Sequence, residues 1–263
     1  MSFEEKFNEF IPELTEALTV PNSTDWAVKG FIDYHKNIYS ISTDTKVVSK
    51  IIELMIFPKF LEFAQRNDYT LELAPHQNYY PDITFVDTDG KKYAVDLKST
   101  YRATSTKVNG MTLGAFTGYF RNRASFKNTL YSYGEYEKHY VFGIIYSRNE
   151  IDSDETTSYT LDNFTEIESV VNEFDFFLQE KWKIATDKAG SGNTKNIGSE
   201  KDIDKLKLGH GLFYREFGDE GKKVFDNYWM NYENKDMSIK AERDEPQYKN
   251  IETYKKWVAS LQK

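Results

Sequence analysis

Two short runs of strand-forming residues around a turn signal most constrain what this chain can fold into. Residues 83 to 87 and 92 to 97 are rich in β-branched and aromatic side chains, and Thr88-Asp89-Gly90 between them is typical of a turn. The pattern predicts a β-hairpin. If its loop spans residues 88 to 90, Asp82 lies opposite Asp96 with Cβ atoms about 5 Å apart.

The hairpin carries a set of charges that suits metal-assisted phosphate chemistry. Strand alternation sends Ala94, Asp96 and Lys98 to one face, beside Pro81-Asp82. One or two carboxylates and a phosphate oxygen are natural ligands for Mg²⁺, and the bound ion activates water. Lys98 is placed to stabilise developing negative charge. The alternative is a solvated hairpin whose charges merely face water, because short motifs also arise by chance.

Composition narrows the class of protein. The chain has 263 residues, of which 39% are hydrophobic and 16% aromatic, enough for a substantial buried core. It has no cysteine, which excludes disulfides and thiolate metal sites, and its four histidines are too scattered to suggest a zinc centre. Neither a signal peptide nor a membrane-spanning stretch is visible. We therefore expect a cytoplasmic protein with no membrane partner.

A net charge of -8 argues against binding of nucleic acid, but the charges are unevenly distributed, and one segment is strongly positive. Residues 97 to 134 contain no acid and six cations, namely Lys98, Arg102, Lys107, Arg121, Arg123 and Lys127. Residues 147 to 175 instead carry nine acids and one arginine, and we assign this acidic segment no function. Such segregation predicts a positive face for a polyanion, with an ordinary solvated surface as the alternative.

The remaining periodicity predicts an α/β chain. Apolar residues at helical spacing predict a helix over residues 3 to 18, kinked or divided at Pro12, and residues 26 to 41 read as a hairpin. Asp44 is a good N-cap for a helix that carries Glu53 and that Pro58 should kink or break. A strand is expected over 140 to 146, and helices in the C-terminal third.

Residues 190 to 199 are expected to form a loop, because they are too polar and rich in glycine for the interior of an element. The loop does not end in the Gly-Lys-Ser/Thr of a phosphate-binding loop. Its glycines let backbone approach a ligand closely, and Asn193 can pair with the N6 and N7 atoms of adenine. The alternative is a flexible surface loop.

Taken together, these segments resemble the type II restriction endonucleases of the PD-(D/E)xK superfamily. The resemblance covers most of the chain and rests on the following runs: Asp44-Thr45-Lys46-Val47 with Glu53, Gln77-Asn78-Tyr79-Tyr80-Pro81-Asp82, Asp96-Leu97-Lys98, Thr112-Leu113-Gly114, Leu178-Gln179-Glu180-Lys181-Trp182, Ala189-Gly190-Ser191-Gly192-Asn193-Thr194, Asn196-Ile197-Gly198-Ser199, Tyr228-Trp229 and Tyr254 to Trp257. The run that begins at Ala189 is the most specific.

The resemblance implies a restriction-endonuclease-like α/β (α+β) core, a mixed central sheet flanked by helices. It implies a single nuclease domain over 1–263, with a dimerisation helix and hairpin in 1–43, the catalytic core and recognition loops in 44–199, and a helical region in 200–263. The implied enzyme is a homodimer that cuts duplex DNA at a short palindrome, GATATC or a close relative, at its centre to leave blunt ends.

The resemblance also implies roles for single residues. Asp82, Asp96 and Glu53 would be acidic groups at a Mg²⁺ site, where Mn²⁺ can substitute, and Lys98 the catalytic lysine. Contacts to DNA would come from Lys46, Gln77, Asn78, Thr100, Arg121, Gly190, Ser191, Gly192, Asn193, Thr194, Lys195 and Asn196. A DNA methyltransferase of the same system would protect the host site.

Three positions depart from the resembled pattern. His76 stands in place of a glutamine, Tyr79 in place of a histidine, and Lys195 in place of a threonine in the loop. An added cation at Lys195 predicts an extra phosphate contact and an altered flanking preference. The catalytic assignment is therefore firmer than the cognate site. Two alternatives stay open, a structure-specific repair or recombination nuclease and a DNA-binding module without turnover.

Overall fold

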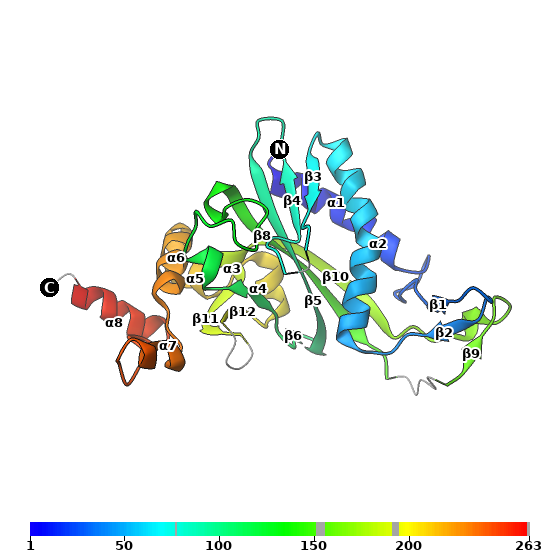
Figure 1. Cartoon of the computed structure of the whole chain (residues 1–263). Coiled ribbons are helices and arrows are strands. Elements are labelled where there is room, and N and C mark those ends of the chain that lie inside the picture. Colours follow the sequence, from blue (N-terminus) through cyan, green and yellow to red (C-terminus); the bar gives the residue numbers. More distant parts are fainter. Residues whose placement is uncertain (77, 151–155, 191–194, 262–263) are drawn as a thin grey trace. The chain divides into compact units, whose positions relative to one another are not determined.

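The computed structural model describes all residues except 77, 151–155, 191–194 and 262–263 (Figure 1). A six-stranded sheet has the order β10-β8-β5-β4-β3, with β6 paired to β5. Its strands are β3 (Thr70–Leu73), β4 (Ile83–Val86), β5 (Lys92–Thr104), β6 (Lys107–Val108), β8 (Tyr136–Arg148) and β10 (Val171–Glu180). This mixed sheet with flanking helices confirms the predicted fold class.

The chain forms two compact units, each assembled from three separate segments. Unit 1 comprises residues 1–71, 99–109 and 143–178, and unit 2 comprises 72–98, 110–142 and 179–263. Strands β5, β8 and β10 pass from one unit to the other along the chain. The predicted single domain with three consecutive regions stays a prediction.

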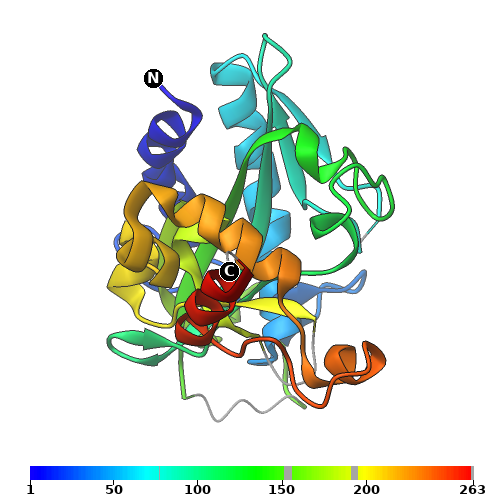
Figure 2. The same ribbon diagram turned by 90° about the vertical axis from the view of Figure 1, so that its left-hand side faces the viewer.

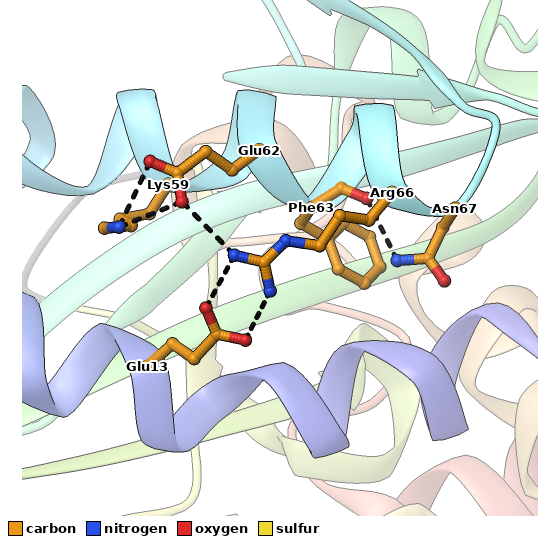
Figure 3. A network of polar contacts seen from close by, with 6 residues as sticks. All are labelled: Glu13, Lys59, Glu62, Phe63, Arg66 and Asn67. Carbon is orange, nitrogen blue, oxygen red and sulfur yellow. Dashed lines mark hydrogen bonds and ion pairs between the residues drawn. The ribbon is translucent and has the colours of Figure 1, made fainter.

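Two long helices in unit 1 pack through aromatic side chains. Phe7 and Phe10 of α1 (Phe3–Leu18) have ring centroids 5.0 and 5.2 Å from that of Phe63 in α2 (Thr45–Arg66). At the edge of this contact, Arg66 binds Glu13 at 2.6 Å and Glu62 at 3.3 Å (Figure 3). The rings are buried, whereas the side chains of the ion pairs are exposed, so burial of the rings contributes more to the stability of this contact.

Proline does not end either helix. Pro12 lies inside α1, and α2 continues past Pro58 to Arg66, so neither proline divides or breaks its helix, and the kink predicted as the alternative stays a prediction. A proline removes one backbone hydrogen bond, but the residues that follow Pro58 bury a continuous apolar face that includes Phe60 and Phe63. Asp44 caps α2 as predicted, accepting from the backbone N–H of Lys46 at 2.9 Å.

The predicted N-terminal hairpin is present in unit 1. Strands β1 (Gly30–Ile32) and β2 (Ile38–Ser40) pair antiparallel, and β9 (Ser158–Tyr159) adds a third strand. Several of its large apolar side chains face solvent, with Phe31 51% and Ile32 58% exposed. This small sheet therefore leaves apolar surface uncovered within the described part of the protein.

Unit 2 contains a second three-stranded sheet and the C-terminal helices. The sheet has the order β11-β12-β7, with β7 (Thr112–Ala115), β11 (Ala185–Ala189) and β12 (Asn196–Ser199). The helices are α3 (Lys181–Ile184), α4 (Ile203–Leu208), α5 (Leu212–Phe217), α6 (Gly221–Asn231), α7 (Lys235–Lys240) and α8 (Ile251–Leu261). Helices α5 and α6 lie side by side, as Figures 1 and 2 show, which confirms the predicted helical C-terminus. Within the described residues, none of the helices combines the length and apolar character that a membrane span requires.

Candidate active site

Strands β4 and β5 pair with the register that the sequence predicted. Ile83 lies opposite Val95, and Val86 lies opposite Lys92. The loop between them is closed by the Asp87 carboxylate, which accepts from the backbone N–H of Lys91 at 2.8 Å, and Gly90 takes a left-handed φ of 80°. Continued by one residue, the same register sets Asp82 beside Asp96.

The hairpin brings Asp82, Asp96 and Lys98 together. Lys98 Nζ is 2.6 Å from Asp96 Oδ2 and 4.0 Å from Asp82 Oδ2, and it donates to the Leu97 carbonyl at 3.0 Å. Asp82 Oδ2 accepts from the backbone N–H of Leu97 at 2.7 Å. The predicted proximity of the trio is thus present, and the solvated alternative fails because Asp96 is only 5% exposed.

The two carboxylates do not ionise alike. Burial, together with the negative charge of Asp96, raises the pKa of Asp82 to about 7. Burial alone would also raise the pKa of Asp96, but Lys98 and the nearby Lys181 outweigh it and lower that pKa below its ordinary value. Because the negative charge of Asp96 disfavours ionisation of Asp82, the pair shares one proton around neutral pH, as two close carboxyl groups do.

The donor set fits a hard divalent cation. Three oxygens, Asp82 Oδ2, Asp96 Oδ2 and the Leu97 carbonyl, already surround the ammonium of Lys98 at 2.6 to 4.0 Å. Carboxylate and carbonyl oxygens are the ligands that Mg²⁺ prefers. Within the described residues, no group of three acidic, histidine or cysteine side chains is positioned to hold a metal. Two carboxylates leave coordination positions that water and a DNA phosphate oxygen can fill.

The predicted third acid lies on another element. Glu53 belongs to α2 in unit 1, where it pairs with Lys50 at 2.9 Å, while Asp82 and Asp96 belong to unit 2. Its role at a metal site stays a prediction.

The structure also reveals a charged residue to which sequence reasoning gave no role. Lys181 at the start of α3 is only 2% exposed, and its Nζ lies 4.2 Å from the centroid of the Tyr80 ring. The available signal was a lysine within the apolar run of residues 174 to 184, where a solvated charge is unexpected.

The loop expected at residues 190 to 199 is shorter than predicted. Asn196–Ser199 form strand β12, which pairs with β11 on one side and with β7 on the other. We call residues 185 to 199 the glycine arm. Gly190 N–H donates to the Asn196 carbonyl at 2.8 Å and closes it. The strand forms despite its polar sequence because neighbouring strands on both sides satisfy its backbone groups.

Some of the residues predicted to contact DNA in and near the arm are described by the structure, and others are not. Ser191, Gly192, Asn193, Thr194 and Gln77 lie outside the described residues. Lys195 is exposed, and its carbonyl accepts from the backbone N–H of Phe116 at 2.9 Å. Asn78 is exposed in the turn between His76 and Tyr79.

The other predicted DNA contacts differ in exposure. Lys46 is exposed in the first turn of α2, whereas Thr100 in β5 is only 4% exposed. Arg121 points into the protein, where its guanidinium donates to the Tyr232 carbonyl and lies 5.7 Å from the centroid of the Phe116 ring. Contacts of these residues with DNA stay predictions.

The acid-free segment is less positive in the folded protein than in the sequence. Lys98 pairs with Asp96, Arg102 with Asp175 at 2.6 Å, and Arg123 with Asp226 at 2.8 Å. With Arg121 bound to a carbonyl, Lys107 and Lys127 are the exposed cations of this segment. Most of its positive charge therefore stabilises the fold.

Comparison with known proteins identifies the family. The family model of the restriction endonuclease EcoRV matches residues 22–259. The chain is also 35% identical over 239 residues to the type II restriction enzyme EcoRV of Escherichia coli, covering 88% of this chain and 90% of that enzyme. This chain belongs to the EcoRV family of restriction endonucleases. It is therefore an endonuclease of a restriction system, a site-specific deoxyribonuclease whose substrate is DNA.

A solved structure, the NlaIV restriction endonuclease, is similar over 92% of this chain and 91% of its own, with a TM-score of 0.37 and 11% identity. That likeness is too low to carry an argument. The family match assigns no role to single residues, so Asp82, Asp96 and Lys98 as the catalytic centre stay a prediction.

Proposed function

We propose that this EcoRV-family enzyme hydrolyses both strands of duplex DNA at a short palindrome, with GATATC as the best candidate, and cuts at the centre to leave blunt ends. The observation that carries the proposal is the pair Asp82 and Asp96 with Lys98 Nζ held between their oxygens. A Mg²⁺ ion at these oxygens, or Mn²⁺ in its place, would polarise the phosphate and lower the pKa of the attacking water.

The chain's own residues perform the other steps. Asp82 would release the proton that it shares with Asp96 to solvent, and the two ionised carboxylates would then hold the divalent cation. Lys98 then leaves the Asp96 carboxylate and directs its ammonium to the phosphate oxygens, where negative charge develops. Glu53 is proposed as an additional acid of the complex with DNA.

Recognition is assigned to the glycine arm and the turn before Asp82. Gly190 to Thr194 would read base edges in the major groove, and Lys195 and Asn196 would follow the backbone. Gln77 and Asn78 would approach the minor groove. Lys46, Thr100 and Arg121 would contact the DNA backbone. A central TA step is easily kinked, so bending of the DNA adds specificity without direct contacts.

A homodimer suits a palindromic site, because one two-fold axis then serves both strands. The exposed apolar residues Phe31, Ile32 and Tyr39, which are 51%, 58% and 45% exposed, favour the small N-terminal sheet as part of the dimer surface. Sedimentation of the wild-type protein and of an Ile32→Ser variant tests this, and a wild-type monomer bound to its site would contradict it. A methyltransferase specific for the same sequence is the expected partner in the cell.

Cleavage of defined plasmids tests the proposal. With Mg²⁺, the purified protein is expected to linearise a plasmid with one GATATC site and to leave intact a matched plasmid with GAATTC, in which the central step is reversed. Sequencing of the ends should find no overhang. Asp96→Ala should abolish cutting while retaining specific binding. Equal cutting of both plasmids, or junction cutting on arms of random sequence, would contradict the proposal.

A further inference from the structure

A buried lysine beside the catalytic centre has no part in the mechanism above. Lys181 is 2% exposed, and Trp182 and Ile184 of the same short helix are also buried. Burial of an ammonium group costs free energy unless other groups compensate its charge. The surroundings of Lys181 therefore indicate what its charge does.

Tyrosine rings surround the ammonium. Lys181 Nζ is 4.2 Å from the ring centroid of Tyr80 and 5.6 Å from that of Tyr133. Tyr119 stacks on Tyr80 with centroids 4.9 Å apart, and His139 stacks on Tyr133 at 3.6 Å. The faces of such rings attract a cation, most strongly where water is excluded.

The rings are uncharged, so the compensating negative charge comes from elsewhere. Burial lowers the pKa of His139 well below its ordinary value, so this ring is neutral, and burial raises the pKa values of Tyr80 and Tyr133. Burial lowers the pKa of Lys181 and the negative charge of Asp96 opposes that change, so that the pKa is about 8. Lys181 therefore remains largely an ammonium ion at neutral pH and acts on Asp96.

Lys181 also adjoins two segments that frame the site. Its partner Tyr80 directly precedes Pro81-Asp82, and the Tyr80 hydroxyl lies 2.8 Å from His139 Nδ1. A Cβ on Gly114 would lie 3.6 Å from Lys181 Nζ, and Gly114 belongs to β7, which pairs with β12 of the glycine arm. The buried charge of Lys181 thus lies against Tyr80, two positions before Asp82, acts electrostatically on Asp96, and lies close to β7, which pairs with the glycine arm.

We propose that Lys181 is a positioning residue that holds the Asp82 and Asp96 pair in place from inside the protein, while Lys98 faces the substrate. This inference rests on the proposed function, in which the pair binds a divalent cation. Because Lys181 is itself a cation, it opposes metal binding electrostatically while it keeps the carboxylates ordered for turnover. Its removal should therefore move metal affinity and turnover in opposite directions.

Lys181→Met tests the proposal, because methionine keeps the length of the side chain and removes the charge. We expect the DNA-free variant to bind Mn²⁺ about tenfold more tightly by calorimetry. Its kcat on the cognate site should fall at least tenfold at saturating metal, with KM within twofold. Lys183→Met is the matched control: Lys183 lies in the same helix, 3.9 Å from Glu180, and its loss should change each quantity less than twofold.

Lys181→Arg provides the second variant, because guanidinium keeps the charge and stacks on aromatic rings. It should retain wild-type affinity for Mn²⁺ and recover part of the lost kcat. Unchanged metal affinity in Lys181→Met, or weaker binding with a lower melting temperature, would mean a merely structural lysine and overturn the proposal. Equally tight binding of Mn²⁺ by the methionine and arginine variants would also overturn it. A wild-type enzyme that binds Mn²⁺ but cuts no DNA would instead refute the proposed function, and the calorimetry would still decide the role of Lys181.

Discussion

The β4–β5 hairpin and the glycine arm are both built from antiparallel strands, yet they are stabilised in different ways. In the hairpin, Asp82, Asp96 and Lys98 meet because neighbours in sequence become neighbours across one ladder. In the arm, β12 depends on β7, which is separated from it by about eighty residues of chain, and on C-terminal groups that bind Asp187 of β11. The hairpin is a local structure, and the arm is assembled by the fold.

The two regions also treat polar groups differently. The hairpin places like charges side by side and lets a shared proton and Lys98 offset their repulsion. The arm instead satisfies backbone groups: the Tyr228 hydroxyl donates to the Asp187 carbonyl at 2.7 Å, and the N–H of Ile251 donates to the Asp187 carboxylate at 2.9 Å. The first arrangement suits a site for a cation, and the second suits a scaffold for a loop. Substitutions in the glycine arm should therefore leave metal binding at the hairpin unchanged, and substitutions in the hairpin should leave the structure of the arm unchanged.

Gly198→Val is expected to give the largest difference between an effect on the glycine arm and an effect on the hairpin. A Cβ at this position would lie 2.5 Å from the Lys188 carbonyl, so valine must push β11 away from β12. Overpacking of this kind costs about 1–3 kcal/mol. We expect cleavage of the cognate plasmid to fall about a hundredfold while Mn²⁺ binding at the hairpin stays unchanged. Gly134→Ala is the control, because its Cβ would make only ordinary contact at 3.4 Å. If Mn²⁺ binding fell together with cleavage, the hairpin and the glycine arm would not be independent of each other.

A smaller effect is expected from pH, and it concerns the hairpin. The pKa of Asp82 is raised to about 7, so below pH 7 a cation must displace a proton, and above pH 7 it meets a free carboxylate. Mn²⁺ affinity measured by calorimetry should therefore fall about tenfold per pH unit below 7 and level off above it. Binding of metal-free protein to DNA through the arm should not follow this curve. A flat metal affinity between pH 6 and 8 would refute the shared proton.

Asp187→Ala should act on the arm with a moderate effect. The carboxylate accepts from the first N–H of α8 and so serves as a helix cap supplied by a strand. Loss of such a cap costs about 1 kcal/mol in the free energy of unfolding. Denaturant titration measures this, and Asp187→Asn, which keeps an acceptor oxygen, should lose less. Discrimination between GATATC and GAATTC should weaken in the alanine variant, because β11 carries one end of the arm.

The smallest effect is expected far from both regions. Arg66 and Glu13 join α1 and α2 at the surface, with side chains 51% and 38% exposed, where water and salt screen the pair (Figure 3). Glu13→Gln should shift the melting temperature less than Asp187→Ala and leave both metal and DNA binding unchanged. A shift larger than that of Asp187→Ala would mean that the ion pair, rather than the phenylalanine rings, holds the two helices together.

Several parts of the structure could be predicted because their causes are local. Turn chemistry at Gly90 sets the hairpin register, and Asp44 caps α2 through its own side chain. Other expectations failed where distant packing decided the outcome. The helix continues through Pro58 because Phe60 and Phe63 are buried against α1, and Asn196–Ser199 become a strand because β7 and β11 lie alongside.

The charges show the same division. Composition alone predicted a positive segment, but Arg102 and Arg123 find Asp175 and Asp226 in sequence more than seventy residues away. No periodicity identifies such partners, because ion pairs need only proximity in space. Glu53 is a similar case: the sequence places it on a helix, and its relation to the carboxylate pair cannot be obtained from spacing.

The sequence by itself determined the hairpin, the opposition of Asp82 and Asp96, and the placement of Lys98 on the same face, because strand geometry repeats every two residues. Only the tertiary structure decided that Asp96 is buried, that the pair holds a proton near pH 7, and that Lys181 is buried against tyrosine rings. The reason is physical. Register depends on neighbours along the chain, whereas burial and charge compensation depend on which distant segments exclude water from the site.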